Sequence, residues 1–332
     1  MKYLRILQKN LVWAIPISML LGLIGGGFFF NAKPLKQLII PITFVMVYPM
    51  MATLNVRSVF SGKDTKLQIT TQIINFIVVP IIVFSLGKIF LGGDEAKYGL
   101  WAVGLFLIGV LPASGMTVSW TGFAHGNKEA ATKMLVYGLV IGSAAAPVYT
   151  KVFMGTTVDV DMLHMFKQIS IFVFVPLIAG ILTQTYIIKR HGKKAWMERY
   201  KPNFPPFSAV GVTMIVFVAM SLKAKNILAH PMDLVTIAIP LVVFYLVSYI
   251  LLTVIGKMFF KRGDAIAMVY GVVMRDLSIA LAIAMTAFGK EGATIALLIS
   301  MAYIFQVQSG AWYVRLAPKI FGPPEKEKVS AT

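Results

Sequence analysis

The chain has 332 residues, of which 58% are hydrophobic and 13% are charged, and its formal net charge is +18. Soluble domains carry about 25% charged residues, so this composition excludes a soluble globular protein. It indicates an all-α polytopic membrane protein, with the lipid bilayer as its surroundings. Cysteine is absent, which excludes disulfides, thiolate metal sites and a cysteine nucleophile.

Membrane-crossing helices need about 20 apolar residues, and the sequence contains roughly ten runs of this kind. The first run follows Lys2, Arg5 and Lys9, which resembles the start of a signal peptide. No clear small-x-small cleavage site follows, so we expect an uncleaved first helix. In chain order the runs cover 11–30, 37–56, 67–91, 98–124 (broken), 129–153, 164–188, 206–222, 232–258, 265–288 (broken) and 292–314.

Basic residues are distributed unevenly between the loops that join these runs. If the N-terminus is cytoplasmic, most of the 31 Lys and Arg residues fall on the cytoplasmic side, whereas the acidic residues divide evenly. This asymmetry predicts that both termini are cytoplasmic, and we expect a multi-pass protein of the plasma membrane. Because the basic residues are spread over many short loops, the net charge indicates topology and not a nucleic-acid-binding surface.

The third and eighth runs end in similar sequences. Residues 86–90 are Leu-Gly-Lys-Ile-Phe and residues 255–259 are Ile-Gly-Lys-Met-Phe, and the same offset superposes the two broken runs. Two repeats with an odd number of helices must be inverted relative to each other in the membrane. We therefore predict inverted five-helix repeats over 1–155 and 156–318, followed by a polar cytoplasmic tail over 319–332.

The fourth run is broken by Pro112 and Ala113, with Ser114 and Gly115 directly after them. Proline removes a backbone donor and the small residues let backbones approach closely. A half-helix that begins near Gly115 would present free amides to an anion, and hydroxyls follow at Thr117 and Ser119. The alternative is a proline kink with small packing residues, which is common in membrane helices.

The ninth run contains two adjacent charges, Arg275 and Asp276. Residue 275 lies ~15 Å along a helix that enters near Ala265, close to the middle of a ~30 Å hydrocarbon core. A lone charge there costs at least ~2.5–3.5 kcal/mol, and neighbours in sequence do not face each other on a helix. These residues are therefore functional candidates, the alternative being a structural arrangement in which Arg275 binds carbonyls of the broken fourth helix.

Residues 111–120 (Leu-Pro-Ala-Ser-Gly-Met-Thr-Val-Ser-Trp) and 274–282 (Met-Arg-Asp-Leu-Ser-Ile-Ala-Leu-Ala) resemble the fourth-helix and ninth-helix motifs of a known superfamily. It is the bile acid:sodium symporter and arsenite-efflux permease superfamily, and the arsenical-resistance-like branch fits best. The resemblance covers essentially the whole chain. It implies ten helices in two inverted repeats, a panel domain, a core domain, and a substrate site beside two crossing broken helices.

Two departures from that pattern affect the expected function. Ala113 stands where the resemblance implies the cysteine of the arsenite permeases. A thiolate is the natural soft ligand for trivalent arsenic, so its absence puts arsenite in doubt as the substrate. The sodium ligands of the symporters align with Gly271, Arg275 and Val118, which implies that the usual sodium sites are missing and that Arg275 places a fixed cation there.

We therefore predict a secondary active transporter of a small anion or oxyanion (an organic acid or an arsenite-like species) that works by alternating access. Asp276 is expected either to pair with Arg275 or to carry a coupling proton. The coupling ion is H⁺ or none, with Na⁺ less favoured. The predicted substrate ligands are Ser114, Gly115, Thr117, Ser119, Arg275 and Ser278.

Two alternatives stay open: a sodium-coupled organic-anion symporter of the bile-acid type, and a non-transporting membrane sensor or receptor on the same fold. An enzyme is not expected, because no paired acids, metal set or nucleophile with its base is visible. The four histidines lack metal-ligand spacing, so neither metal nor cofactor is expected. Four further polar residues of the membrane runs either reach the crossing of the broken runs or only join helices by hydrogen bonds: Gln72, Asn75, Gln306 and Gln308. We favour the second interpretation, because such hydrogen bonds are common in helical membrane proteins.

Overall fold

The computed structural model describes residues 2–54, 64–93, 96–156 and 161–323. Every regular element within these residues is a helix, so the predicted all-α class is confirmed. The first half contains α1 (Lys2–Lys9), α2 (Leu11–Ile24), η1 (Gly25–Phe29), η2 (Lys33–Leu38), α3 (Ile39–Ala52), α4 (Thr65–Ile73), η4 (Ile74–Val78), α5 (Val79–Phe90), α6 (Ala96–Val110), α7 (Gly115–Phe123) and α8 (Lys128–Met154).

The second half begins with a long helical stretch that includes both the sixth and the seventh predicted runs. Its elements are α9 (Met162–Ile169), η5 (Ser170–Phe174), α10 (Val175–Ala195), η6 (Trp196–Tyr200), η7 (Lys201–Asn203), α11 (Pro205–Ala229), α12 (Met232–Phe259), α13 (Arg262–Val273), α14 (Leu277–Ala287) and α15 (Gly292–Phe321).

Seven helices among the described residues are long and apolar enough to cross a membrane, or up to nine if each bent pair is one span. The chain is therefore a multi-pass membrane protein, while the count of ten spans stays a prediction. The break in the fourth run is clear, because α6 and α7 are bent by 64°. The ninth run is also divided, with Met274–Asp276 non-helical between α13 and α14.

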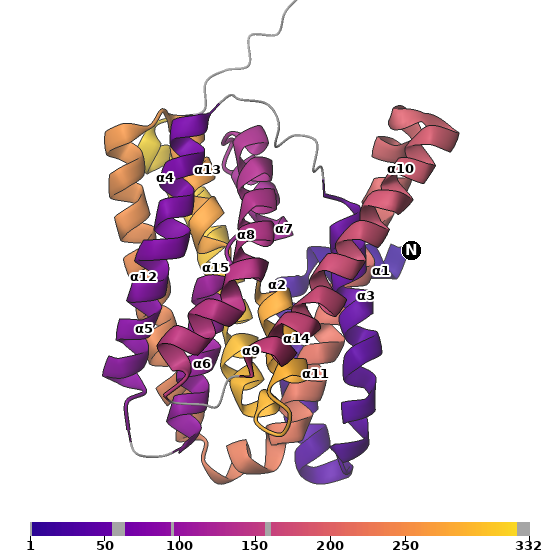
Figure 1. Ribbon diagram of the computed structural model, residues 1–332, viewed down its shortest axis with the longest axis vertical. Helices are drawn as coiled ribbons and strands as arrows, with labels where there is room; N and C mark the ends of the chain where they lie inside the picture. Colours follow the sequence, from indigo (N-terminus) through magenta and orange to yellow (C-terminus); the bar gives the residue numbers. More distant parts are fainter. Residues whose placement is uncertain (1, 55–63, 94–95, 157–160, 324–332) are drawn as a thin grey trace, which may run out of the picture.

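The helices pack in two groups (Figure 1). One group, which we call the panel, has α11 packed against α2 and α3, and α10 packed against α3. The other group, the core, contains α4 to α8 and α12 to α15, with α5 against α6 and α12 against α13 and α15. Helix α14 of the core contacts α3 and α11 of the panel, and α15 contacts α2 and α11, so the second broken run borders the panel through α14.

Close backbone contact holds the panel helices together. A Cβ atom at Gly211 of α11 would lie only 2.6 Å from the backbone nitrogen of Met46 in α3, a distance at which atoms must move. Glycine therefore lets these two helices approach until their backbones touch, as small residues do at membrane helix interfaces.

A π-helical turn, η4, interrupts the third run just before Pro80. Proline cannot donate to the carbonyl four residues earlier, and the Phe76 carbonyl accepts a hydrogen bond of 2.7 Å from the Tyr149 hydroxyl of α8. The freed carbonyl is thus satisfied inside the bilayer, as membrane helices require. The turn contains Asn75, which is fully buried, and π turns are frequent at functional sites.

Candidate functional site

The two breaks meet and are joined through their backbones. The amide of Ser114 donates to the carbonyl of Met274 at 2.9 Å, and the amide of Asp276 donates to the carbonyl of Leu111 at 2.9 Å. Each break thus satisfies polar backbone groups of the other, as non-helical backbone at membrane depth must. We call this junction the crossing.

The first break turns the chain sharply and then starts a new helix. Ala113 adopts the left-handed conformation with φ of 56°, which costs an L-residue roughly 1–2 kcal/mol. Ser114 then caps α7, because its Oγ accepts from the amide of Met116 at 3.2 Å. Pro112 and Ala113 are both buried. They lie beside Gly138 of α8, where a Cβ would be 3.1 Å from the Pro112 carbonyl oxygen.

The second break is capped in the same way by a carboxylate. Asp276 Oδ1 accepts from the amide of Ile279 at 3.1 Å, which fixes the start of α14. The other oxygen, Oδ2, is buried and accepts no hydrogen bond from the residues that the structure describes. A buried carboxylate oxygen without a donor is unfavourable, and protonation of this oxygen would reduce that cost.

Arg275 is fully buried and points into the core, away from Asp276. Its Nε donates to the Ile108 carbonyl at 3.0 Å, and its Nη2 donates to the Gly109 carbonyl. Its Nη1 donates to Asn75 Oδ1 at 2.6 Å and to the Val272 carbonyl at 2.8 Å. In the described part of the chain no ion pair joins Arg275 to Asp276. The bonds to the Ile108 and Gly109 carbonyls correspond to the structural alternative of the sequence analysis, in which Arg275 binds carbonyls of the broken fourth helix.

The six predicted substrate ligands fall into two sets. Ser114, Thr117 and Arg275 are buried at the crossing and make hydrogen bonds to protein groups, Thr117 reaching the Met274 carbonyl at 3.5 Å. The other three are at least partly accessible: Gly115, Ser119 and Ser278.

Gly115 opens toward the panel. A Cβ atom at this position would lie 3.7 Å from Cγ of Met50 in α3, so the start of α7 faces a panel helix. Ser278, at the start of α14, bonds through its Oγ to the Tyr303 hydroxyl of α15 at 2.9 Å. The starts of both half-helices therefore lie at the crossing, and that of α7 borders the panel.

Two residues are more central than the sequence interpretation made them. Asn75 binds Arg275 across 200 positions of sequence. Gln306 of α15 holds the backbone of the same residue from both sides, accepting from its amide at 2.9 Å and donating to its carbonyl at 3.0 Å. Tyr245 donates to Gln306 at 3.1 Å. The available sequence signal was an uncharged amide in an apolar run, which is also typical of ordinary helix pairing.

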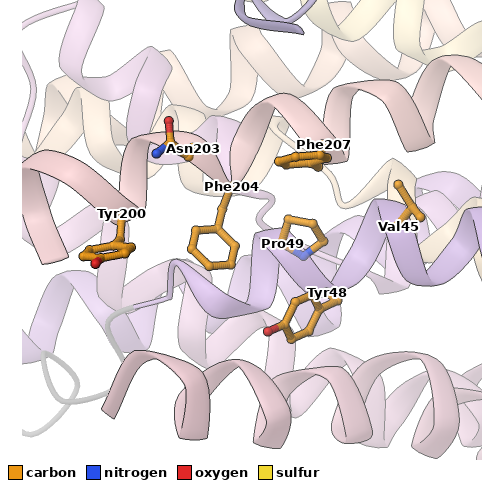
Figure 2. A pocket seen from close by; sticks show the side chains of 7 residues that line it. All are labelled: Val45, Tyr48, Pro49, Tyr200, Asn203, Phe204 and Phe207. Atoms are coloured by element: carbon orange, nitrogen blue, oxygen red, sulfur yellow. The ribbon is translucent and has the colours of Figure 1, made fainter. Parts of the chain in front are cut away.

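A separate apolar pocket of about 410 Å³ lies in the panel (Figure 2). None of the predicted site residues lines it. In the part of the chain that the structure describes, no group of three His, Asp or Glu side chains is arranged to hold a metal ion. The pocket is lined by Val45, Tyr48, Pro49, Tyr200, Asn203, Phe204 and Phe207.

Comparison with known proteins finds relatives named for arsenical resistance and for bile acid cotransport. The arsenical-resistance protein Acr3 of Corynebacterium glutamicum is 23% identical, over 94% of this chain and 88% of that protein. The protein of the same name from Alkaliphilus metalliredigens is 23% identical, over 80% and 78%. The mouse (Mus musculus) sodium/bile acid cotransporter 7 is 28% identical, over 53% of this chain and 52% of that protein.

A family model described as the Sodium Bile acid symporter family matches residues 40–230, more than half of the chain. The match includes the first break and the surrounding helices α3 to α11. The family is named for symporters and the mouse relative for cotransport, so the chain belongs with transporters and not with enzymes. The crossing of two broken membrane helices thus belongs to a polytopic transporter fold, and the chain is a member of the Sodium Bile acid symporter family.

Proposed function

We propose that the protein is a secondary active transporter that moves a small anion or oxyanion by alternating access. The carrying observation is the crossing, where α7 and α14 both begin and where Gly115 of α7 faces the panel. Helix N-termini attract anions because their free amides and dipole point toward the ligand. In the proposed cycle the core rocks against the panel, so that this end of α7 opens first to one side and then to the other.

Three of the predicted ligands are suited to touch the substrate directly. Gly115, Ser119 and Ser278 are at least partly accessible and offer an amide and two hydroxyl groups. Ser114, Thr117 and Arg275 act by holding the two half-helices in place, because their polar groups already bond to protein atoms. The relatives named for arsenical resistance and for bile acid cotransport support an anion or oxyanion as the substrate class.

Asp276 is the proposed coupling residue. Its Oδ1 is occupied by the α14 cap, while its Oδ2 is buried with no donor among the described residues. A proton taken up here changes the charge beside both half-helix N-termini, where an anion is proposed to bind. We propose H⁺ coupling, or transport without a coupling ion, and not the use of the usual sodium sites.

The proposed setting is the plasma membrane, with both chain ends in the cytoplasm. The excess of basic residues in the loops on one side supports this orientation. The proposed repeats remain 1–155 and 156–318, with the tail over 319–332.

The test is flux into proteoliposomes of the purified protein. Arsenite and a panel of small organic anions are each measured with a sodium gradient, with a proton gradient and with neither. We expect saturable flux of at least one anion that is unchanged by sodium. Organic-anion flux that follows the sodium gradient would instead support the symporter alternative, and binding without flux would support the sensor alternative.

A further inference from the structure

The apolar pocket of the panel is open on one side. It forms where α3 meets the segment that runs from η6 to the start of α11, and side chains from both face each other across it (Figure 2). Val45 and Phe207 in its wall are 42% and 43% exposed. The volume of about 410 Å³ is in the range of small-ligand pockets, ~300–1,000 Å³. In a membrane protein, an open apolar pocket of this size can hold part of a lipid acyl chain.

Three basic residues border this pocket, and we call them the basic rim: Arg5, Arg199 and Lys201. Arg5 Nη2 donates to Oδ1 of Asn203, which lines the pocket, at 2.6 Å. The Arg199 guanidinium carbon lies 5.9 Å from the ring centre of Tyr200, another lining residue, and Lys201 directly follows Tyr200 in the chain. Positive charge is therefore concentrated at one edge of an apolar pocket.

Within the part of the chain that the structure describes, no carboxylate pairs with the basic rim. The ion pairs of these residues join Lys97 to Asp233, and Lys133 to Asp64 and Glu129. Residues 185–204, which connect α10 to α11, contain six basic residues but only one acidic residue. The charge of the rim is thus not neutralised by ion pairs within the described chain, and an anion from the surroundings can compensate it.

Helix α1 brings Arg5 to the pocket and lies across the membrane helices. It is bent by 98° from the helix that follows it and packs against α11. Its apolar side chains Tyr3 and Ile6 are exposed, as is Arg5 between them. A short helix of mixed polarity at right angles to the membrane helices is typical of the membrane interface, where acyl chains meet headgroups. This places the basic rim at the depth of the lipid headgroups.

We propose that the pocket and the basic rim bind one anionic phospholipid, with an acyl chain in the pocket and the phosphate at the rim. Basic pockets between membrane helices on the cytoplasmic side bind anionic headgroups, and the predicted orientation puts the rim on that side. Arginine is well suited to phosphate because its N–H groups can make two parallel bonds. The lipid then joins α1 and the start of α11 to α3. None of the proposed substrate ligands lines the pocket, so this inference does not depend on the transported substrate.

The experiment measures the thermal unfolding midpoint of the purified full-length protein in detergent with added lipid. Phosphatidylglycerol and phosphatidylcholine with the same acyl chains are compared, and glycerol 3-phosphate supplies the anionic headgroup without chains. We expect phosphatidylglycerol to raise the midpoint by several degrees and to saturate, since a ligand stabilises the state that binds it. Equal shifts with both phospholipids, or an equal shift with glycerol 3-phosphate, would overturn the proposal.

A variant with glutamine at all three positions of the basic rim tests where the lipid binds. We expect it to lose at least half of the shift caused by phosphatidylglycerol. The control carries Lys189→Gln, Lys193→Gln and Lys194→Gln, which remove the same charge from exposed positions of α10 that do not line the pocket. The control should keep the shift. An equal loss in both variants would mean that lipid is attracted only by the overall charge, and would contradict a defined site.

Val45→Trp tests the pocket without altering any charge, and it also applies if the rim variant does not fold. The larger side chain fills the pocket from α3, so we expect the response to phosphatidylglycerol to fall. Ile40→Trp, at an exposed position of the same helix outside this pocket, should leave the response unchanged. Cholate is the competing ligand, because it too is an amphipathic anion. A larger shift with cholate than with phosphatidylglycerol would assign the pocket to a soluble anion and overturn the lipid proposal.

Discussion

The two breaks at the crossing are built alike but face different surroundings. Both end a helix, bond to each other through backbone amides and start a new helix with a side-chain cap. Beyond the first break, α7 has accessible positions and faces the panel at Gly115, whereas the second break and the start of α14 are almost entirely buried. We propose that both breaks border the substrate, the first through Gly115 and Ser119 and the second through Ser278, whereas only the second break carries charged side chains, Arg275 and Asp276.

The largest expected effect is on coupling and concerns Asp276→Asn. The amide keeps an oxygen to cap Ile279, so the protein should fold, but the side chain can no longer gain or lose a proton. We expect pH-dependent transport to be abolished, measured as proteoliposome flux over a pH series. Unchanged pH dependence would remove the proposed difference between the breaks and leave Asp276 with a structural role only.

Asn75→Leu tests whether the second break depends on the hydrogen bond between Arg275 and Asn75. The substitution removes the acceptor that bonds Arg275 at 2.6 Å, and a hydrogen bond to a charged group contributes about 1.5–3 kcal/mol. We expect a loss of that size in the free energy of unfolding, measured by denaturant titration in detergent. Gln308→Leu, at a half-buried glutamine of α15, is the control and should change stability little.

Ser114→Ala tests the cap of the first break. Loss of an N-cap hydroxyl costs about 0.5–2 kcal/mol, and here it frees the Met116 amide beside the proposed binding surface. We expect that loss of stability together with a changed apparent substrate affinity and an unaltered pH profile. A shifted pH profile in this variant would argue against assigning coupling to the second break alone.

The smallest expected effect is a gain in stability caused by Ala113→Gly. Glycine relieves the cost of the left-handed φ of 56°, and the greater freedom of the unfolded chain offsets part of this gain. We expect a net stabilisation of roughly 0.5–1 kcal/mol. Ala146→Gly, at a buried position within regular α8, should have the opposite sign, by about 1 kcal/mol. Destabilisation at both positions would mean that the turn at Ala113 is not strained.

Much of the fold could be predicted because its signals are local. Apolar runs predict membrane helices, and α8 begins and ends within one residue of the expected 129–153. The seventh run was predicted too short, at 206–222, because Lys223 and Lys225 end its apolar character, yet α11 continues to Ala229. Long lysine side chains can extend toward an interface while the backbone stays helical, so charge marks the end of the apolar region and not of the helix.

The site could be predicted only in part because its contacts are long-range. Pro112 and the adjacent charges Arg275 and Asp276 mark the two breaks in the sequence, and the structure joins them. That Arg275 would turn toward Asn75 and not toward Asp276 depends on how α6, α13 and η4 pack, which no local pattern encodes. The π turn that carries Asn75 was not predicted either, since a proline near a helix start is compatible with several backbone paths.

The fixed position of the buried Arg275 guanidinium, together with the proposal that the usual sodium sites are not used, has a consequence for the energy that drives transport. An ion that binds on one side of a membrane and leaves on the other releases the energy of its gradient, whereas a side chain returns to its starting point in every cycle and releases none. Uphill movement must then draw on protons, on another solute or on the membrane potential acting on the substrate. A monoanion that leaves a cell whose interior is 100 mV negative gains about 2.3 kcal/mol, which sustains a concentration ratio of roughly fiftyfold. For an exporter of anions, that potential alone is a sufficient driving force.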